Sequence, residues 1–191
     1  MNKLTSLLIT VSLTLTLSAG VNAQGDVKDH PGYVDFSSLA GFGGAEPTVQ
    51  ISLKTPLLNM VTNLLRQDDA EAAEFVSKLL RVSVSVFESE SEALDLGEVS
   101  NSMVLLASEL DAQNWERVVR VRENENHVDI YFRISPDADF IYGIAVMVAE
   151  ESEIVLVNIV GDISVDDLGA LARRFDIDEL SDIDINVDTD L

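Results

Sequence analysis

A group of arginines on one short stretch of the sequence is the feature most suited to chemistry. The chain has 12 basic residues against 34 acidic ones, and four of its arginines lie on two neighbouring runs that predict a hairpin: Arg117, Arg120, Arg122 and Arg133. Strand alternation places Arg120 and Arg122 on one polar face and Tyr131 and Arg133 on the polar face of the next strand. Guanidinium groups bind carboxylates and phosphates through paired hydrogen bonds. We therefore predict a face for an anion or an acidic partner, formed by Arg120, Arg122, Tyr131 and Arg133.

The same arginines also have a purely structural interpretation. Glu116, Glu123 and Asp129 lie on the same two runs. Opposite charges on neighbouring strands commonly pair across an antiparallel sheet. In this alternative the arginines form ordinary cross-strand ion pairs and hold no ligand.

Carboxylates beside Gly161 could hold a metal, in the stretch VGDISVDDL over residues 160–168. Ser164 followed three residues later by Asp167 matches a capping box. Acidic residues in a first helical turn also complement the helix dipole. The stretch therefore predicts a capped helix start and no metal site.

The acidic residues 176–191 form a second candidate metal site, because DIDINVD from Asp182 has oxygen side chains at alternate positions. A calcium loop of the EF-hand type needs glycine at its sixth position and glutamate at its twelfth. Val187 occupies the sixth position and the chain ends before the twelfth. Two interpretations remain: a solvated acidic tail, or a strand along a sheet edge with Ile183, Ile185 and Val187 facing inward.

The sequence contains few residues and no motif suited to enzymatic catalysis. His30 and His127 are the two histidines, and cysteine is absent. The motifs of zinc proteases, serine hydrolases and phosphate-binding loops do not occur. We predict no catalytic residue, no metal ligand and no cofactor.

The N-terminus has the pattern of a secretory signal. Lys3 precedes an apolar run over 7–17, and Val21 and Ala23 occupy the −3 and −1 positions of a signal-peptidase site. The run is shorter than the roughly 20 residues of a membrane span. The sequence predicts cleavage between Ala23 and Gln24, a periplasmic or secreted protein, and no stable membrane insertion after cleavage.

Periodicity predicts the order of the structural elements. Glycine and proline predict a flexible leader over 24–47, with one helical turn near 36–39. Alternating runs predict strands at 48–54, 81–88, 114–123, 127–135, 139–150 and 153–161. Helices are predicted to begin at Thr55, Asp68 and Ser100, with a last helix over 164–175. Helical spacing is kept by Leu57, Met60, Val61 and Leu64 in the first helix and by Met103, Leu106, Ala107 and Leu110 in the third. The inward stripe of the second helix is expected to consist of Ala72, Phe75, Val76 and Leu79.

These elements predict an α+β fold. We expect an antiparallel sheet of five to six strands, of which the last four form a meander, with three to four helices packed mainly on one face. The last two strands are apolar on both faces and are expected to be central and covered on both sides. The predicted organisation is a signal peptide at 1–23, a leader at 24–47, a single domain at 48–175 and an acidic tail at 176–191.

Three stretches together resemble a known family: EFVSKLLRVSVSVFE, NWERVVRVRENENHVDIYFRIS and MVAEESEIVLVNIVGDISVDDLGALARRF. They are similar to the bacterial envelope family named domain of unknown function 4252, over most of 48–175. The resemblance implies a small exported α+β domain, often a lipoprotein, with no assigned activity. This chain lacks the lipobox cysteine, so the resemblance does not carry lipid anchoring over to it.

Three functions follow, in order. The first is a non-enzymatic periplasmic or secreted binding module whose partner is an envelope protein. The second is a protein that binds a small anion at the arginine face or a divalent cation at the carboxylates, and the third is a hydrolase. The net charge of −22 repels phosphate backbones, so no nucleic-acid partner is expected.

Overall fold

The computed structural model describes residues 26–89, 91, 93–123, 126–164 and 166–167. The predicted signal peptide with its cleavage site at Ala23 and Gln24, most of the last helix and the acidic tail lie outside these residues. Within the described part of the chain, no helix is long and apolar enough to cross a membrane.

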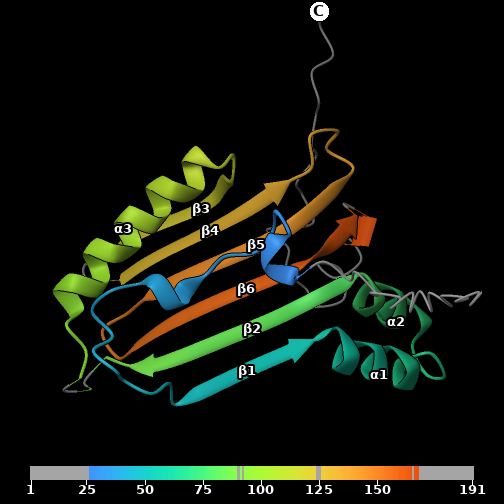
Figure 1. Cartoon of the computed structure of the whole chain (residues 1–191), viewed down its shortest axis with the longest axis horizontal. Coiled ribbons are helices and arrows are strands. Elements are labelled where there is room, and N and C mark those ends of the chain that lie inside the picture. Colours follow the sequence, from blue (N-terminus) through green and yellow to red (C-terminus); the bar gives the residue numbers. More distant parts are fainter. Residues whose placement is uncertain (1–25, 90, 92, 124–125, 165, 168–191) are drawn as a thin grey trace, which may run out of the picture.

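Six antiparallel strands form one sheet in the order β1-β2-β6-β5-β4-β3 (Figure 1). Their bounds are β1 Val49–Lys54, β2 Leu79–Glu88, β3 Glu116–Glu123, β4 Asn126–Ile134, β5 Phe140–Ala149 and β6 Glu153–Ser164. The last four strands are joined by short connections and form the predicted meander. With three helices in the described residues, the predicted α+β class is confirmed.

Helix α3 (Leu96–Ala112) lies in front of β3 and β4 (Figure 1). Its predicted inward residues Met103, Leu106, Ala107 and Leu110 are all buried. The helix begins earlier than predicted, because Asp95 accepts a hydrogen bond from the amide of Glu98 and caps it. Ser100, the predicted cap, therefore lies inside the helix.

Helices α1 (Thr55–Leu65) and α2 (Ala70–Ser77) lie at the end of β1 and β2 (Figure 1). The helically spaced apolar residues of α1 do not mark its buried side, since Met60 is 63% and Leu64 72% exposed while Leu58 and Thr62 are buried. Leu58 packs with Leu79, Ile141 and Ile163. Apolar residues surround α1, so their spacing alone did not identify the buried side.

Two of the predicted caps at these helices also differ. The hydroxyl of Thr55 donates to the carbonyl of Leu80 at 3.0 Å instead of capping α1. Asp69, and not Asp68, accepts the amide hydrogen bond at the start of α2. Both helix starts were therefore predicted to within two residues, but the capping contacts were not.

The segment 26–47 differs from the flexible leader predicted for it. It contains two short 3-10 helices, η1 (Val27–Asp29) and η2 (Phe36–Ser38), and the second is the predicted turn. Val34 and Leu39 are buried in the same core cluster as α3. The segment crosses in front of β5 and β6 (Figure 1), so it forms part of the layer that covers this face.

The side-chain amide of Asn158 on β6 holds this segment to the sheet. Asn158 is 0% exposed, and its Oδ1 accepts from the Val34 amide at 3.0 Å. Its Nδ2 donates to the carbonyls of Gly32 at 3.0 Å and Ile144 at 3.2 Å. A Cβ at Gly32 would lie 1.8 Å from the Tyr142 carbonyl oxygen. This glycine therefore marks a close backbone approach, not flexibility.

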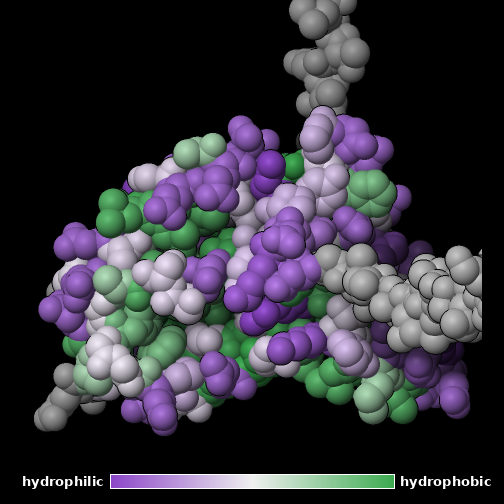
Figure 2. All heavy atoms as spheres, viewed as in Figure 1, coloured by the Kyte–Doolittle hydropathy of each residue, from purple (hydrophilic) through white to green (hydrophobic). Residues whose placement is uncertain are grey.

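The covered face has hydrophilic residues on its outer surface, with hydrophobic side chains visible between α3 and the 26–47 segment (Figure 2). The opposite face carries two rows of β-branched residues that cross all six strands in register: Val49, Val86, Val155, Val148, Val128 and Val121, then Ile51, Val84, Val157, Val146, Ile130 and Val119. None of these twelve is fully buried. β5 and β6 were predicted to be covered on both faces. The structure covers them completely only on the face toward α3.

Replacing Asn158 with alanine should destabilise the protein strongly. The change removes the hydrogen bonds that this side chain makes with the Val34 amide and with the Gly32 and Ile144 carbonyls, which costs about 2–4 kcal/mol of unfolding free energy. Urea denaturation measures the loss, with Asn101→Ala on the exposed side of α3 as the control. A loss below about 0.5 kcal/mol, the range of ordinary surface substitutions, would show that the amide does not hold the segment.

Candidate functional site

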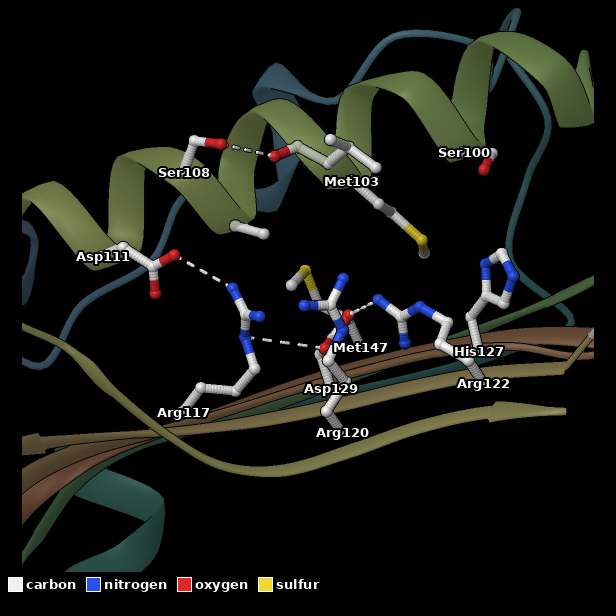
Figure 3. A pocket seen from close by; sticks show the side chains of 12 residues that line it. Ser100, Met103, Ser108, Asp111, Arg117, Arg120, Arg122, His127, Asp129 and Met147 are labelled. Carbon is white, nitrogen blue, oxygen red and sulfur yellow. Dashed lines mark hydrogen bonds and ion pairs between the residues drawn. The ribbon is translucent and has the colours of Figure 1, made fainter.

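A cavity of about 310 Å³ lies between α3 and the sheet (Figure 3). From α3 it is lined by Ser100, Met103, Val104, Ala107, Ser108 and Asp111. From the strands it is lined by Arg117, Arg120, Arg122, His127, Asp129 and Met147. We call this cavity the arginine groove.

The strand geometry places three arginines in the groove. Arg120 and Arg122 are two residues apart on β3 and face the same side; their partners across β4 are Asp129 and His127. Arg117 is three residues from Arg120, so regular alternation would send it to the opposite face. A bulge between Arg117 and Val119 changes the register, and Arg117 therefore joins the groove.

Asp129 is the carboxylate that holds two of these arginines. It is 7% exposed. Its Oδ2 accepts a short hydrogen bond from Arg122 Nη2, and its Oδ1 lies 3.7 Å from Arg117 Nε (Figure 3). Asp129 Oδ1 has no hydrogen-bond partner among the described residues. Asp129 thus neutralises charge in the groove while keeping one oxygen without a hydrogen bond.

Arg117 is fixed by three further contacts. Its Nη2 donates to Asp111 Oδ2 at 2.9 Å, and its Nε donates to Tyr131 Oη at 2.6 Å. Its guanidinium lies 5.0 Å from the centre of the Tyr131 ring. Burial raises the pKa of the Tyr131 phenol, and the hydrogen bond from Arg117 opposes that rise. Arg117 is therefore a rigid wall of the groove.

Arg120 differs from its two neighbours. Its side chain points from β3 toward α3 (Figure 3), and it forms no hydrogen bond or ion pair with any residue that the structure describes. The groove contains three guanidinium groups and two carboxylates, so one positive charge remains. Arg120 carries the charge that is free to bind a ligand.

The predicted face is brought together only in part. Arg120 and Arg122 line the groove, but Tyr131 is 0% exposed and lies beneath Arg117. Arg133 donates to the carbonyl of Asn114 at 2.9 Å and does not line the cavity. Arg117 was counted among the hairpin arginines but was left out of the predicted face, because no sequence signal marks the bulge. The cross-strand alternative holds for Asp129, whereas no ion pair of Glu116 or Glu123 is present among the described residues.

The two histidines lie apart from one another. His127 is half-buried and lines the groove. His30 Nδ1 accepts from the Gly32 amide at 3.2 Å, and its Nε2 lies 3.7 Å from Asp162 Oδ1. The residues with a described structure contain no group of three or more His, Asp or Glu arranged to hold a metal ion.

The predicted capping box at the end of β6 is confirmed. The amide and hydroxyl of Ser164 donate to Asp167 Oδ2, and the Asp167 amide donates to Ser164 Oγ at 3.4 Å. Asp167 also pairs with Lys78 Nζ at 2.8 Å. Asp167 is thus occupied by structural contacts, in agreement with the capping interpretation.

A family model described as Domain of unknown function (DUF4252) matches residues 42–171. The match covers the whole sheet and α3, and therefore every residue of the groove. No curated protein and no solved structure matches the chain.

The ion pair of Asp167 with Lys78 should make stability fall in acid. Burial works against the carboxylate, but hydrogen bonds from Lys78 and Ser164 outweigh it and lower the pKa of Asp167 below its ordinary value of 3.8. A lowered folded-state pKa gives stability that is present above the unfolded-state pKa and lost as the pH falls through the folded-state pKa. Asp167→Asn should reduce the unfolding free energy at pH 7 and flatten its decrease between about pH 5 and pH 2.

Urea denaturation at a series of pH values measures this slope. Asp166→Asn removes an exposed neighbouring carboxylate and serves as the control, with a wild-type slope expected. If Asp167→Asn keeps the wild-type slope as well, the ion pair contributes nothing to the acid sensitivity.

Proposed function

We propose that this chain, which belongs to the family Domain of unknown function (DUF4252), is a non-enzymatic binding module for an anionic group. The groove between α3 and the β3–β4 hairpin is the proposed site. The observation that carries the proposal is Arg120, a guanidinium in a lined cavity without a partner among the described residues. An arginine is the side chain best suited to bind a carboxylate or a phosphoryl group.

The lining of the groove narrows the class of ligand. Its volume of about 310 Å³ is at the lower end of the range for small-molecule sites. Met103, Ala107 and Met147 supply an apolar wall beside the guanidinium groups. We infer a small carboxylate or phosphoryl group next to a short apolar portion, either free or carried by a larger partner.

The contacts of the two carboxylates in the groove favour a binding function over catalysis. Carboxylates that are bonded to arginines hold those guanidinium groups in place. Asp129 contacts both Arg117 and Arg122, and Asp111 contacts Arg117. Both acids of the groove therefore position arginines in our proposal.

The cellular location is a further part of the proposal. The signal pattern at the N-terminus supports export to the periplasm or the outside of the cell, with an envelope protein as the partner. Intact-mass measurement of the protein from the exported fraction should show a chain that begins at Gln24. A chain that retains residues 1–23, or that remains entirely with the cytoplasm, would contradict export.

Substitution of Arg120 tests the binding site. We expect inorganic phosphate and succinate, compared with chloride at equal ionic strength, to raise the melting temperature and shift the NMR signals of groove residues. Arg120→Gln should weaken binding by roughly tenfold or more, since hydrogen bonds to charged groups contribute about 1.5–3 kcal/mol. Because Arg120 is exposed and unpaired among the described residues, the variant should keep its fold.

Arg66→Gln is the matched control. It removes one positive charge from the end of α1, where Arg66 is exposed and bonds Asn63, and should leave anion binding unchanged. Two results would refute the proposal: no anion-specific effect on the wild-type protein, or an equal loss of binding in both variants.

A further inference from the structure

The sheet face opposite α3 carries apolar residues that the described helices leave uncovered. The two rows of β-branched residues named above cross all six strands on this face, and we call them the open rows. Neither of the two buried apolar clusters includes any of these twelve residues. On the two edge strands, Val49, Ile51 and Val121 are exposed. A contiguous apolar surface of this kind commonly marks an interaction site.

One end of this face is covered by α1 and α2. Leu58 of α1 and Phe75 of α2 pack in one cluster with Ile163 near the end of β6. Ile159 on β6 and Ile144 on β5 pack against the same cluster and are only partly buried. The open rows begin two residues further along these strands, on the same face. The helical cover therefore stops where the open rows begin.

The described chain ends at the covered end of this face. β6 ends at Ser164, whose capping box with Asp167 starts a helical turn at 166–167. Lys78, directly after α2, lies 2.8 Å from Asp167 Oδ2 and 3.4 Å from Glu74 Oε1 of α2. The turn that follows β6 is therefore fixed beside α2, next to the apolar cluster.

The burial of this turn shows which of its sides faces the protein. The side chain of Asp167 is only 14% exposed, whereas Asp166 is exposed. The sequence continues with apolar residues at the spacing of one helical stripe: Leu168, Leu171, Ala172 and Phe175. In a helix that continues from Asp167, this stripe is opposite Asp166, and Leu171 lies one turn after Asp167 on the same side. The stripe would therefore face the protein.

The length of this segment suits the uncovered surface. Eight residues of helix, 168–175, extend about 12 Å. Neighbouring strands lie about 4.8 Å apart, and β6, β5 and β4 are adjacent in the sheet. A helix that starts at the end of β6 can therefore cover side chains on all three strands, beginning with Ile159 and Ile144.

A second copy of the chain fits this face less well. Glu88 and Glu153 are directly opposite one another beside the open rows, and both are exposed. Two sheets packed face to face would bring such carboxylates together, in chains that each carry a net charge of −22. Residues 168–175 are joined to β6 by the chain itself, so their docking is intramolecular and gains from a high effective concentration.

We propose that residues 168–175 of this chain cover the open rows on β4, β5 and β6. They continue the helical turn that begins after Ser164 and place their apolar stripe on Ile159, Ile144 and the neighbouring valines. This adds a helix beside α2, on the face of the sheet opposite α3. The arginine groove lies on the face of α3, so this docking leaves the groove open to its ligand.

A spin label on the segment tests where it lies. The sequence has no cysteine, so Arg173→Cys gives one site for a nitroxide, on the polar side of the expected helix. The label on the full exported chain should remove the NMR methyl signals of Val157 and Val146 and leave those of Leu106, which is buried under α3. A label at Asn101→Cys, on the exposed side of α3, is the matched control and should act on Leu106 first.

Substitution of the stripe gives a second measurement. Leu171→Ser with Phe175→Ser should lower the melting temperature by about 5–10 °C, because two apolar side chains lose their burial. In the Arg173→Cys background, the same pair should restore the signals of Val157 and Val146. Ala170→Ser with Arg174→Ser changes the other side of the expected helix and should shift the melting temperature by less than about 2 °C.

A mixture of two proteins excludes a second copy as the occupant. Spin-labelled chains without isotopes are mixed with isotope-labelled chains without a spin label, and the methyl signals should then keep their full intensity. Signal loss in this mixture overturns the proposal, because the segment would then dock on another molecule. An Arg173→Cys label that spares Val157 and Val146, or stripe and control pairs that lower the melting temperature equally, also overturns it.

Discussion

The amide of Asn158 is the contact on which the layer that covers the sheet depends. It is fully buried on a central strand and bonds the backbone of residues 32 and 34 as well as β5. Upstream of this contact, η1 lines a second cavity together with Lys54 and Arg81. Downstream, the same segment meets α3, where Ser102 Oγ donates to the Ala40 carbonyl and the Asp95 amide donates to that of Gly41. One buried polar group thus positions the segment that packs against α3, the helix that forms one wall of the groove.

The distribution of charge explains how a strongly acidic protein can bind an anion in the arginine groove. A large net negative charge opposes the approach of any anion at long range. Anion binding therefore requires local cations with fixed geometry and few competing carboxylates. The groove meets this requirement by bonding its acids to Arg117 and Arg122, which leaves Arg120 free.

Periodicity was sufficient to predict the strands and most helices, because alternation and helical spacing are local properties of the chain. It placed the four-strand meander, the buried stripe of α3 and the capping box of Asp167 correctly. Features that depend on distant contacts were missed. The bulge beside Arg117 arises from pairing with β4, and the order of residues 26–47 arises from Asn158, more than a hundred positions away. Arg133 was included in the face because alternation cannot show that its side chain turns to Asn114.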